Sequence, residues 1–203
     1  MVQTITVERE YGSGGVEFAR LLAQHLGWEL VDQTLVQEVA KRANVSDAVA
    51  EHCDERLDPW YNKMGRAFWH GSNERATTMV EQEIFDATTM TELMQQVVQE
   101  KARAGKCVIV GRGAGCALHG IPGCFHVFVY ASMARKIRWF EQTFPTRAHL
   151  AERELLATDR RRAEYVDHFY HNVWNDYRMY HLMLNSCMGF EAMIGATIEA
   201  TGI

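Results

Sequence analysis

The chain has 203 residues and carries 21 lysines and arginines against 26 aspartates and glutamates, which gives a formal charge of −5. This length suits one α/β domain with an insertion, and the acidic balance argues against a nucleic-acid scaffold while allowing a local basic cleft. We therefore expect no nucleic-acid partner, and because no apolar run approaches the roughly 20 residues of a membrane span, we expect no membrane partner either.

Residues 5–15 predict a strand that runs through a glycine-rich turn directly into a helix, in which Leu22 and Leu26 belong to one buried face. Glycines let main-chain N–H groups point inward, and a helix N-terminus adds partial positive charge, so this arrangement suits phosphate. The candidate phosphate cradle consists of Gly12, Ser13, Gly14 and Gly15.

The turn lacks two residues of a standard P-loop, which ends in a lysine followed by a serine or threonine. Val16 and Glu17 follow the glycines here. Judged on the turn alone, a tight connection without any ligand is therefore as good an interpretation as a phosphate site.

A second short apolar run, residues 28–31, predicts a strand that ends at Asp32. An acid at the C-terminal end of a parallel strand lies on the edge where α/β sheets bind ligands. The alternative for Asp32 is the N-cap of the next predicted helix, residues 33–43.

Residues 33–104 indicate a helical block without a convincing strand, which includes a long helix at about 78–103. The aromatic residues at 60–69 are more typical of a core or a helix–helix seam than of a cofactor site. A homodimer or dimeric scaffold that uses them as its interface is the alternative.

The second half of the chain predicts strands at 107–111, 125–130 and 181–185, followed by a final helix whose last part is 194–200. Arg112 follows the first of these strands, and residues 146–180 form a helical, charge-rich segment. Arg160 and Arg162 in this segment suit either anion binding or a solvated helix face paired with Glu164. Apolar strands separated by helices argue for a parallel sheet with helices on both faces.

Five cysteines are present, an odd number without any CxxC spacing. Several of them lie in apolar runs, so we expect reduced, buried thiols rather than disulfides or a zinc site. Together with an N-terminus that enters a strand without a signal peptide, this favours a cytoplasmic protein.

These landmarks resemble the cytidylate kinase-like family of P-loop nucleoside monophosphate kinases. The resemblance rests on their order over nearly the whole chain. The matching stretches are 9–15, Asp32, 108–114, 159–162 with Tyr165, Trp174 and 180–185.

The resemblance implies a three-layer P-loop fold with a five-stranded parallel sheet, made of a core (1–32, 105–145 and 176–203), a helical acceptor-binding insertion (33–104) and a lid (146–175). It implies transfer of the ATP γ-phosphoryl group, with Mg²⁺, to a nucleoside monophosphate, CMP or dCMP first. A nucleotide-binding regulatory protein with this fold, or a kinase of another small acceptor, is the alternative.

The resemblance also assigns roles to individual residues. The glycine turn would hold the ATP phosphates, and Arg112 would grip the acceptor phosphate. Arg160 and Arg162 would be lid arginines that stabilise the transferring group. Asp32 would orient the acceptor or hydrated magnesium.

Two departures bear on these roles. Gly15 occupies the slot of the P-loop lysine and Glu17 that of the magnesium-binding hydroxyl, so we hypothesise that Arg9 replaces the lysine and Glu17 offers a carboxylate to the metal. Gly113 stands where cytidylate kinases usually have an acceptor-binding aspartate, which leaves the acceptor open.

Overall fold

The computed structural model describes residues 1–32, 34–44 and 87–203. They divide into two compact units, Met1–Asp32 with Val98–Ile203, and Gln33–Val97. The predicted aromatic interface at 60–69, Cys53 and the beginning of the predicted 78–103 helix lie outside the described residues. No helix within the described ranges is long and apolar enough to cross a membrane.

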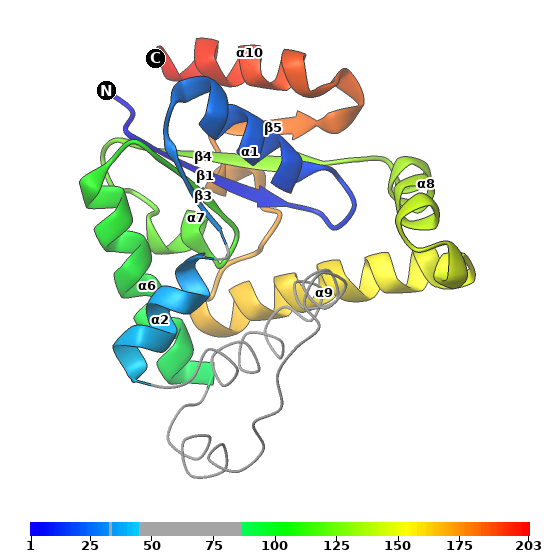
Figure 1. The fold of residues 1–203 in the computed structure, drawn as a ribbon, viewed down its shortest axis with the longest axis horizontal. Helices are drawn as coiled ribbons and strands as arrows, with labels where there is room; N and C mark the ends of the chain where they lie inside the picture. The colour runs from blue at the N-terminus through cyan, green and yellow to red at the C-terminus, as the bar shows by residue number, and fades with distance from the viewer. Residues whose placement is uncertain (33, 45–86) are drawn as a thin grey trace. The chain divides into compact units, whose positions relative to one another are not determined.

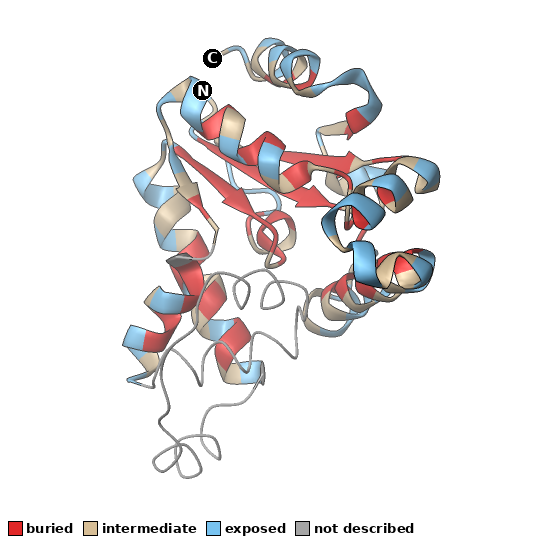
Figure 2. Cartoon of the chain, turned by 45° about the vertical axis from the view of Figure 1, so that its right-hand side comes forward, coloured by how far each residue is buried: buried red, intermediate tan, exposed pale blue. Residues whose placement is uncertain are grey.

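The first unit is built on one sheet of five parallel strands in the order β2-β3-β1-β4-β5 (Figure 1). The strands are β1 (Thr4–Arg9), β2 (Glu29–Val31), β3 (Cys107–Val110), β4 (Cys124–Tyr130) and β5 (Leu182–Asn185). The predicted α/β class and five-stranded parallel sheet are thus confirmed. Every residue of β1 and β3 is buried, as expected of central strands covered on both faces (Figure 2).

Helices cover both faces of this sheet. The helices of the first unit are α1 (Gly15–Leu26), α7 (Ala114–Ala117), α8 (Met133–Thr143), α9 (Ala151–Tyr170) and α10 (Phe190–Thr201), with 3₁₀ turns η1 (Pro145–Leu150), η2 (Tyr177–Met179) and η3 (Ser186–Met188). Helices α1 and α10 pack on one face through Phe18, Leu22 and Met193. Val166 of α9 and Trp174 pack on the other face against Phe128.

The remaining helices are α2 (Thr34–Ala43), which belongs to the second unit, and α6 (Ala87–Ala104), whose residues are divided between the two units. The acceptor-binding role of the predicted insertion (33–104) and the closing role of the predicted lid (146–175) stay predictions.

The structure corrects one prediction about the thiols. Four cysteines lie in the described residues and none of them forms a disulfide, but only Cys107 is buried. Cys187 is exposed because it lies in the short turn η3 after the last strand, where the chain leaves the sheet.

Candidate functional site

The glycine turn connects β1 to α1 and is held closed by its own main chain. Gly12 and Gly14 adopt left-handed conformations, with φ of 76° and 85°, which residues with a Cβ rarely adopt. The N–H of Ser13 donates to the carbonyl of Glu10 at 3.3 Å, and its hydroxyl donates to the same oxygen at 2.8 Å. Both groups of Ser13 therefore point back into the turn, and its predicted phosphate contact stays a prediction.

Gly15 begins helix α1 and lies directly against the side chain of Arg9. A Cβ on Gly15 would lie 2.9 Å from Cγ of Arg9 and 3.2 Å from Cβ of Val129, and closer still to Cβ of Arg9. Position 15 thus has no room for a side chain. The stem of Arg9 fills the space that a lysine would occupy there.

Three arginines converge at the C-terminal edge of the sheet. Arg112 lies in a left-handed turn, 111–113, with φ values of 67°, 60° and 66°. The guanidinium of Arg9 packs against Gly111, where a Cβ would lie 2.9 Å from its Cζ. Burial and the neighbouring charges of Arg9 and Arg162 together lower the pKa of Arg112 to about 10, against the opposing effects of Asp32 and Tyr165.

This cluster contains more positive than negative charge, and its electrostatics favour an anion. Arg9, Arg112 and Arg162 contribute three guanidinium groups, whereas two carboxylates lie among them: Asp32, which acts on Arg112, and Asp159, 3.9 Å from Arg162. Within the described residues, the buried Nε of Arg9 and Oδ1 of Asp32 make no hydrogen bond. Guanidinium groups that repel one another in a partly buried site are stabilised when a phosphate or carboxylate binds between them.

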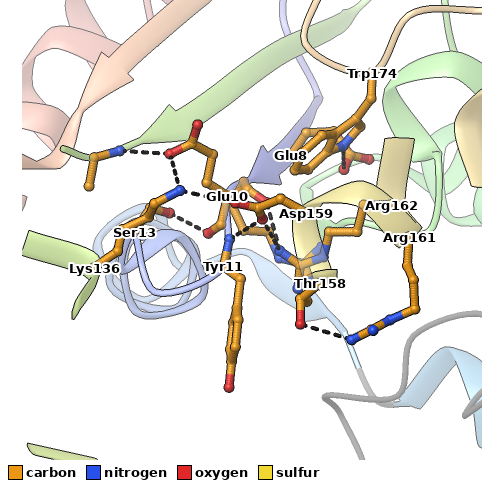
Figure 3. A network of polar contacts seen from close by, with 12 residues as sticks. Glu8, Glu10, Tyr11, Ser13, Lys136, Thr158, Asp159, Arg161, Arg162 and Trp174 are labelled. Carbon is orange, nitrogen blue, oxygen red and sulfur yellow. Dashed lines mark hydrogen bonds and ion pairs between the residues drawn. The ribbon is translucent and has the colours of Figure 1, made fainter. Parts of the chain in front are cut away.

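Helix α9 reaches the glycine turn through two charged residues (Figure 3). Asp159 accepts a hydrogen bond from the N–H of Tyr11 at 2.6 Å. Arg162 donates to the main-chain carbonyl of Arg9 at 2.8 Å and lies 5.9 Å from the centre of the Tyr11 ring. The side chain of Arg162 is only 7% exposed, because it is enclosed between α9 and the end of β1.

The other predicted lid arginine faces away from this cluster. Arg160 is 80% exposed and forms an ion pair of 2.8 Å with Glu164, which is the helix-face pairing considered from the sequence. Its predicted catalytic role stays a prediction, whereas Arg162 lies with Arg9 and Arg112.

Glu17 lies in the first turn of α1 with its carboxylate held by Arg20. Both of its oxygens accept hydrogen bonds from the guanidinium, at 2.8 and 3.0 Å, and this pairing lowers the pKa of Glu17. The predicted metal role would require Glu17 to exchange Arg20 for the cation. No group of three or more potential metal ligands is found in the described part of the chain.

Tyr170, at the end of α9, closes the space beside Gly113. A Cβ on Gly113 would lie 2.8 Å from Cζ of the Tyr170 ring, and the Tyr170 hydroxyl donates to the carbonyl of Arg112 at 3.5 Å. The ring of Tyr170 therefore fills the space that a side chain at position 113 would need, which is the position where cytidylate kinases usually carry an aspartate.

Lys136 of α8 lies beside the glycine turn, although the surrounding sequence does not predict this position. Its ammonium group lies 3.0 Å from Glu10 and 3.0 Å from Asp159, and only 5% of its side chain is exposed. It stands between Arg135 and Arg138 in a charged helix, a context typical of a solvated face. The available signal was Phe140, which is buried four residues later on the same face of α8.

A model of the cytidylate kinase-like family matches residues 4–187 of this chain. A search of curated proteins gives no match. Among solved structures, an uncharacterized protein from Eubacterium ventriosum superposes with a TM-score of 0.71 at 18% identity, with 100% of this chain and 99% of that chain covered.

Two further solved structures share the fold at a greater distance. A shikimate kinase from Bacteroides thetaiotaomicron gives a TM-score of 0.56 at 16% identity, covering 99% of both chains. TT1252 from Thermus thermophilus gives 0.50 at 16% identity, covering 98% of this chain and 97% of that one. These likenesses show a P-loop kinase fold.

Proposed function

We propose that this chain, which belongs to the cytidylate kinase-like family, transfers the γ-phosphoryl group of ATP to a small phosphorylated acceptor, with CMP or dCMP as the first candidates. The products would be ADP and the acceptor diphosphate. The observation that carries the proposal is the convergence of Arg9, Arg112 and Arg162 at the C-terminal edge of the sheet, next to the glycine turn.

Phosphoryl transfer needs what this arrangement offers. The reaction requires two anionic substrates held in line and positive charge around the moving group, with little covalent chemistry from the protein. The main chain of the glycine turn would hold the ATP phosphates. Arg112 would hold the acceptor phosphate, and Arg9 and Arg162 would stabilise charge on the transferred group.

Magnesium would enter as the complex with ATP, because Mg²⁺ commonly binds through substrate phosphates and one or two carboxylates. Asp32 fits as one such carboxylate, since its Oδ1 makes no hydrogen bond within the described residues. Asp32 would otherwise orient the acceptor.

The choice of acceptor rests on the family resemblance alone. The ring of Tyr170 beside Gly113 leaves no room for the aspartate that usually helps hold CMP. A different nucleotide, or another small acceptor, is therefore the alternative for the substrate. A nucleotide-binding regulatory protein without transfer activity is the alternative for the function.

A coupled assay of ADP release tests this proposal. It would use ATP with Mg²⁺ and a panel of CMP, dCMP, UMP, AMP and shikimate. We expect saturable, acceptor-dependent turnover with a nucleoside monophosphate, and a loss of about 10²-fold or more in Arg112→Ala. Arg178→Ala, which breaks an exposed pair with Asp176, is the control variant. Nucleotide binding without turnover would favour the regulatory alternative.

A further inference from the structure

Lys136 joins three segments of the chain at one buried point (Figure 3). Its Nζ contacts Oε2 of Glu10, which precedes the glycine turn, and Oδ2 of Asp159 on α9. Burial alone would lower the pKa of Lys136, but the carboxylates of Asp159 and Glu10 outweigh this effect and raise it. The ammonium group is therefore held in its charged form between two acids.

Each of these acids also holds a main-chain N–H group. Oδ1 of Asp159 accepts from Tyr11 at 2.6 Å, and Oε2 of Glu10 accepts from Ala131 at 3.2 Å. The glycine turn is thus fastened at residue 10 to the end of β4 and at residue 11 to α9. Lys136 links these two contacts, because its ammonium group forms ion pairs with both Glu10 and Asp159.

We infer that Lys136 is a positioning residue for the phosphate cradle, and this role rests on the proposed function. It fixes the start of the glycine turn through Glu10 and Asp159, and it cancels the charge of two carboxylates beside a site for triphosphate. Without this cation the two acids would repel each other and the incoming phosphates, because buried like charges are poorly screened.

The same contact places Arg162. Asp159 and Arg162 lie one turn apart on α9, with 3.9 Å between their charged groups. A shift of Asp159 would therefore also move the arginine that contacts the carbonyl of Arg9. Lys136 acts through these residues rather than on substrate, because its ammonium is enclosed by carboxylates and its side chain is only 5% exposed.

Three variants separate positioning from general stability. Lys136→Met removes the charge, and Lys136→Arg keeps it. The double variant K136M/D159N removes one charge of the repelling pair while the amide oxygen can still accept from Tyr11. Lys101→Met is the matched control, since Lys101 forms a 2.7 Å ion pair with Glu29 on the outside of the unit.

The measurements are calorimetric binding of tripolyphosphate and of ATP with Mg²⁺, together with KM and kcat from the coupled assay. For Lys136→Met we expect affinity for both ligands to fall at least about tenfold, with KM for ATP rising in parallel and kcat falling less. Lys136→Arg and K136M/D159N should each recover part of the affinity. Lys101→Met should match the wild-type chain.

Unchanged affinity for tripolyphosphate in a folded Lys136→Met variant would overturn the inference, as would equal losses in K136M and K136M/D159N. If Lys136→Met does not fold, Asp159→Ala carries the test, with the same tenfold loss expected and unchanged affinity overturning it. A wild-type chain that binds tripolyphosphate and ATP but transfers nothing refutes the proposed function and leaves these binding comparisons decisive. A wild-type chain that binds neither overturns both.

Discussion

The side chain of Arg9 packs directly against Gly15, and this contact requires a glycine at position 15. The stem of Arg9 crosses the start of α1, and any Cβ at position 15 would collide with it. The guanidinium continues past Gly111 toward Arg112. A positive charge therefore lies beside the glycine turn, although it comes from the preceding strand rather than from the helix.

Gly15→Ala should lower the free energy of unfolding by roughly 1–3 kcal/mol, the usual cost of overpacking, because Cβ of Arg9 has no freedom to move away. Urea denaturation measures this change. Gly195→Ala in α10 is the control, since nothing lies within 4 Å of a Cβ there, and it should stabilise the chain by about 0.5–1 kcal/mol. Equal effects of the two substitutions would contradict the proposed collision.

Arg9→Ala tests whether this guanidinium serves the phosphates. The hydrogen bond from Arg162 goes to the main-chain oxygen of Arg9 and survives the substitution. We therefore expect α9 to remain docked while KM for ATP rises about tenfold or more, roughly 1.4 kcal/mol. Arg9→Lys should recover part of this loss. Turnover and ATP affinity equal to those of the wild-type chain would rule the role out.

The left-handed turn 111–113 is the element that presents Arg112. A positive φ strains the backbone of any residue except glycine. In this turn only Arg112 is strained in this way, because Gly111 and Gly113 lie on either side of it. Tyr170 covers the turn, so the end of α9 and the end of β3 are fitted to each other. Strained backbone of this kind is typical of functional sites.

Gly113→Ala should cost roughly 2–4 kcal/mol, because strain at positive φ adds to the collision with the Tyr170 ring. In a Tyr170→Ala background the collision disappears and only the strain, about 1–2 kcal/mol, should remain. A double-mutant cycle by thermal or urea unfolding measures this coupling. Additive effects would show that the ring moves aside freely.

The buried face of helix α9 was readable from the sequence. In α9 the buried residues include Leu155, Arg162 and Val166, which recur every four or seven residues. This stripe could have separated Arg162 from Arg160 in advance. Phe140 on the same face of α8 indicated that Lys136 is buried, but its partners Glu10 and Asp159 could not be predicted, because they come from two other segments.

At the scale of the whole molecule, buried polar groups make stability depend on pH. His126 lies within β4, with Nδ1 2.8 Å from the Thr6 hydroxyl, and the main-chain N–H of His126 donates to Nδ1 of His181. Burial, together with the neighbouring His181 and His119, lowers the pKa of His126 to about 4. The folded chain therefore keeps this imidazole neutral where the unfolded chain would protonate it.

Acidification should weaken the fold for this reason. Between pH 6.5 and about 4 the unfolded chain binds a proton that folded His126 excludes, so the free energy of unfolding falls as pH falls, by roughly 3 kcal/mol in total. Urea midpoints across this range measure the slope. His126→Asn should remove most of this contribution, and an unchanged slope in that variant would assign it to other groups.

The α/β architecture could be predicted from the sequence, because apolar strands that alternate with helices indicate a parallel sheet covered on both faces. The position of Arg112 after β3 was equally readable. The contact between Tyr170 and Gly113 could not be predicted from the sequence, because the two residues are 57 positions apart and meet only after α9 has packed.

The hydrogen bond from Tyr11 to Asp159 joins residues 148 positions apart. During synthesis, the strand, turn and first helix therefore leave the ribosome long before the carboxylate that fastens them exists. The turn acquires its final form only after translation has passed residue 159. If nucleotide capture needs the fastened turn, nascent chains arrested before residue 159 should not be retained on an ATP column.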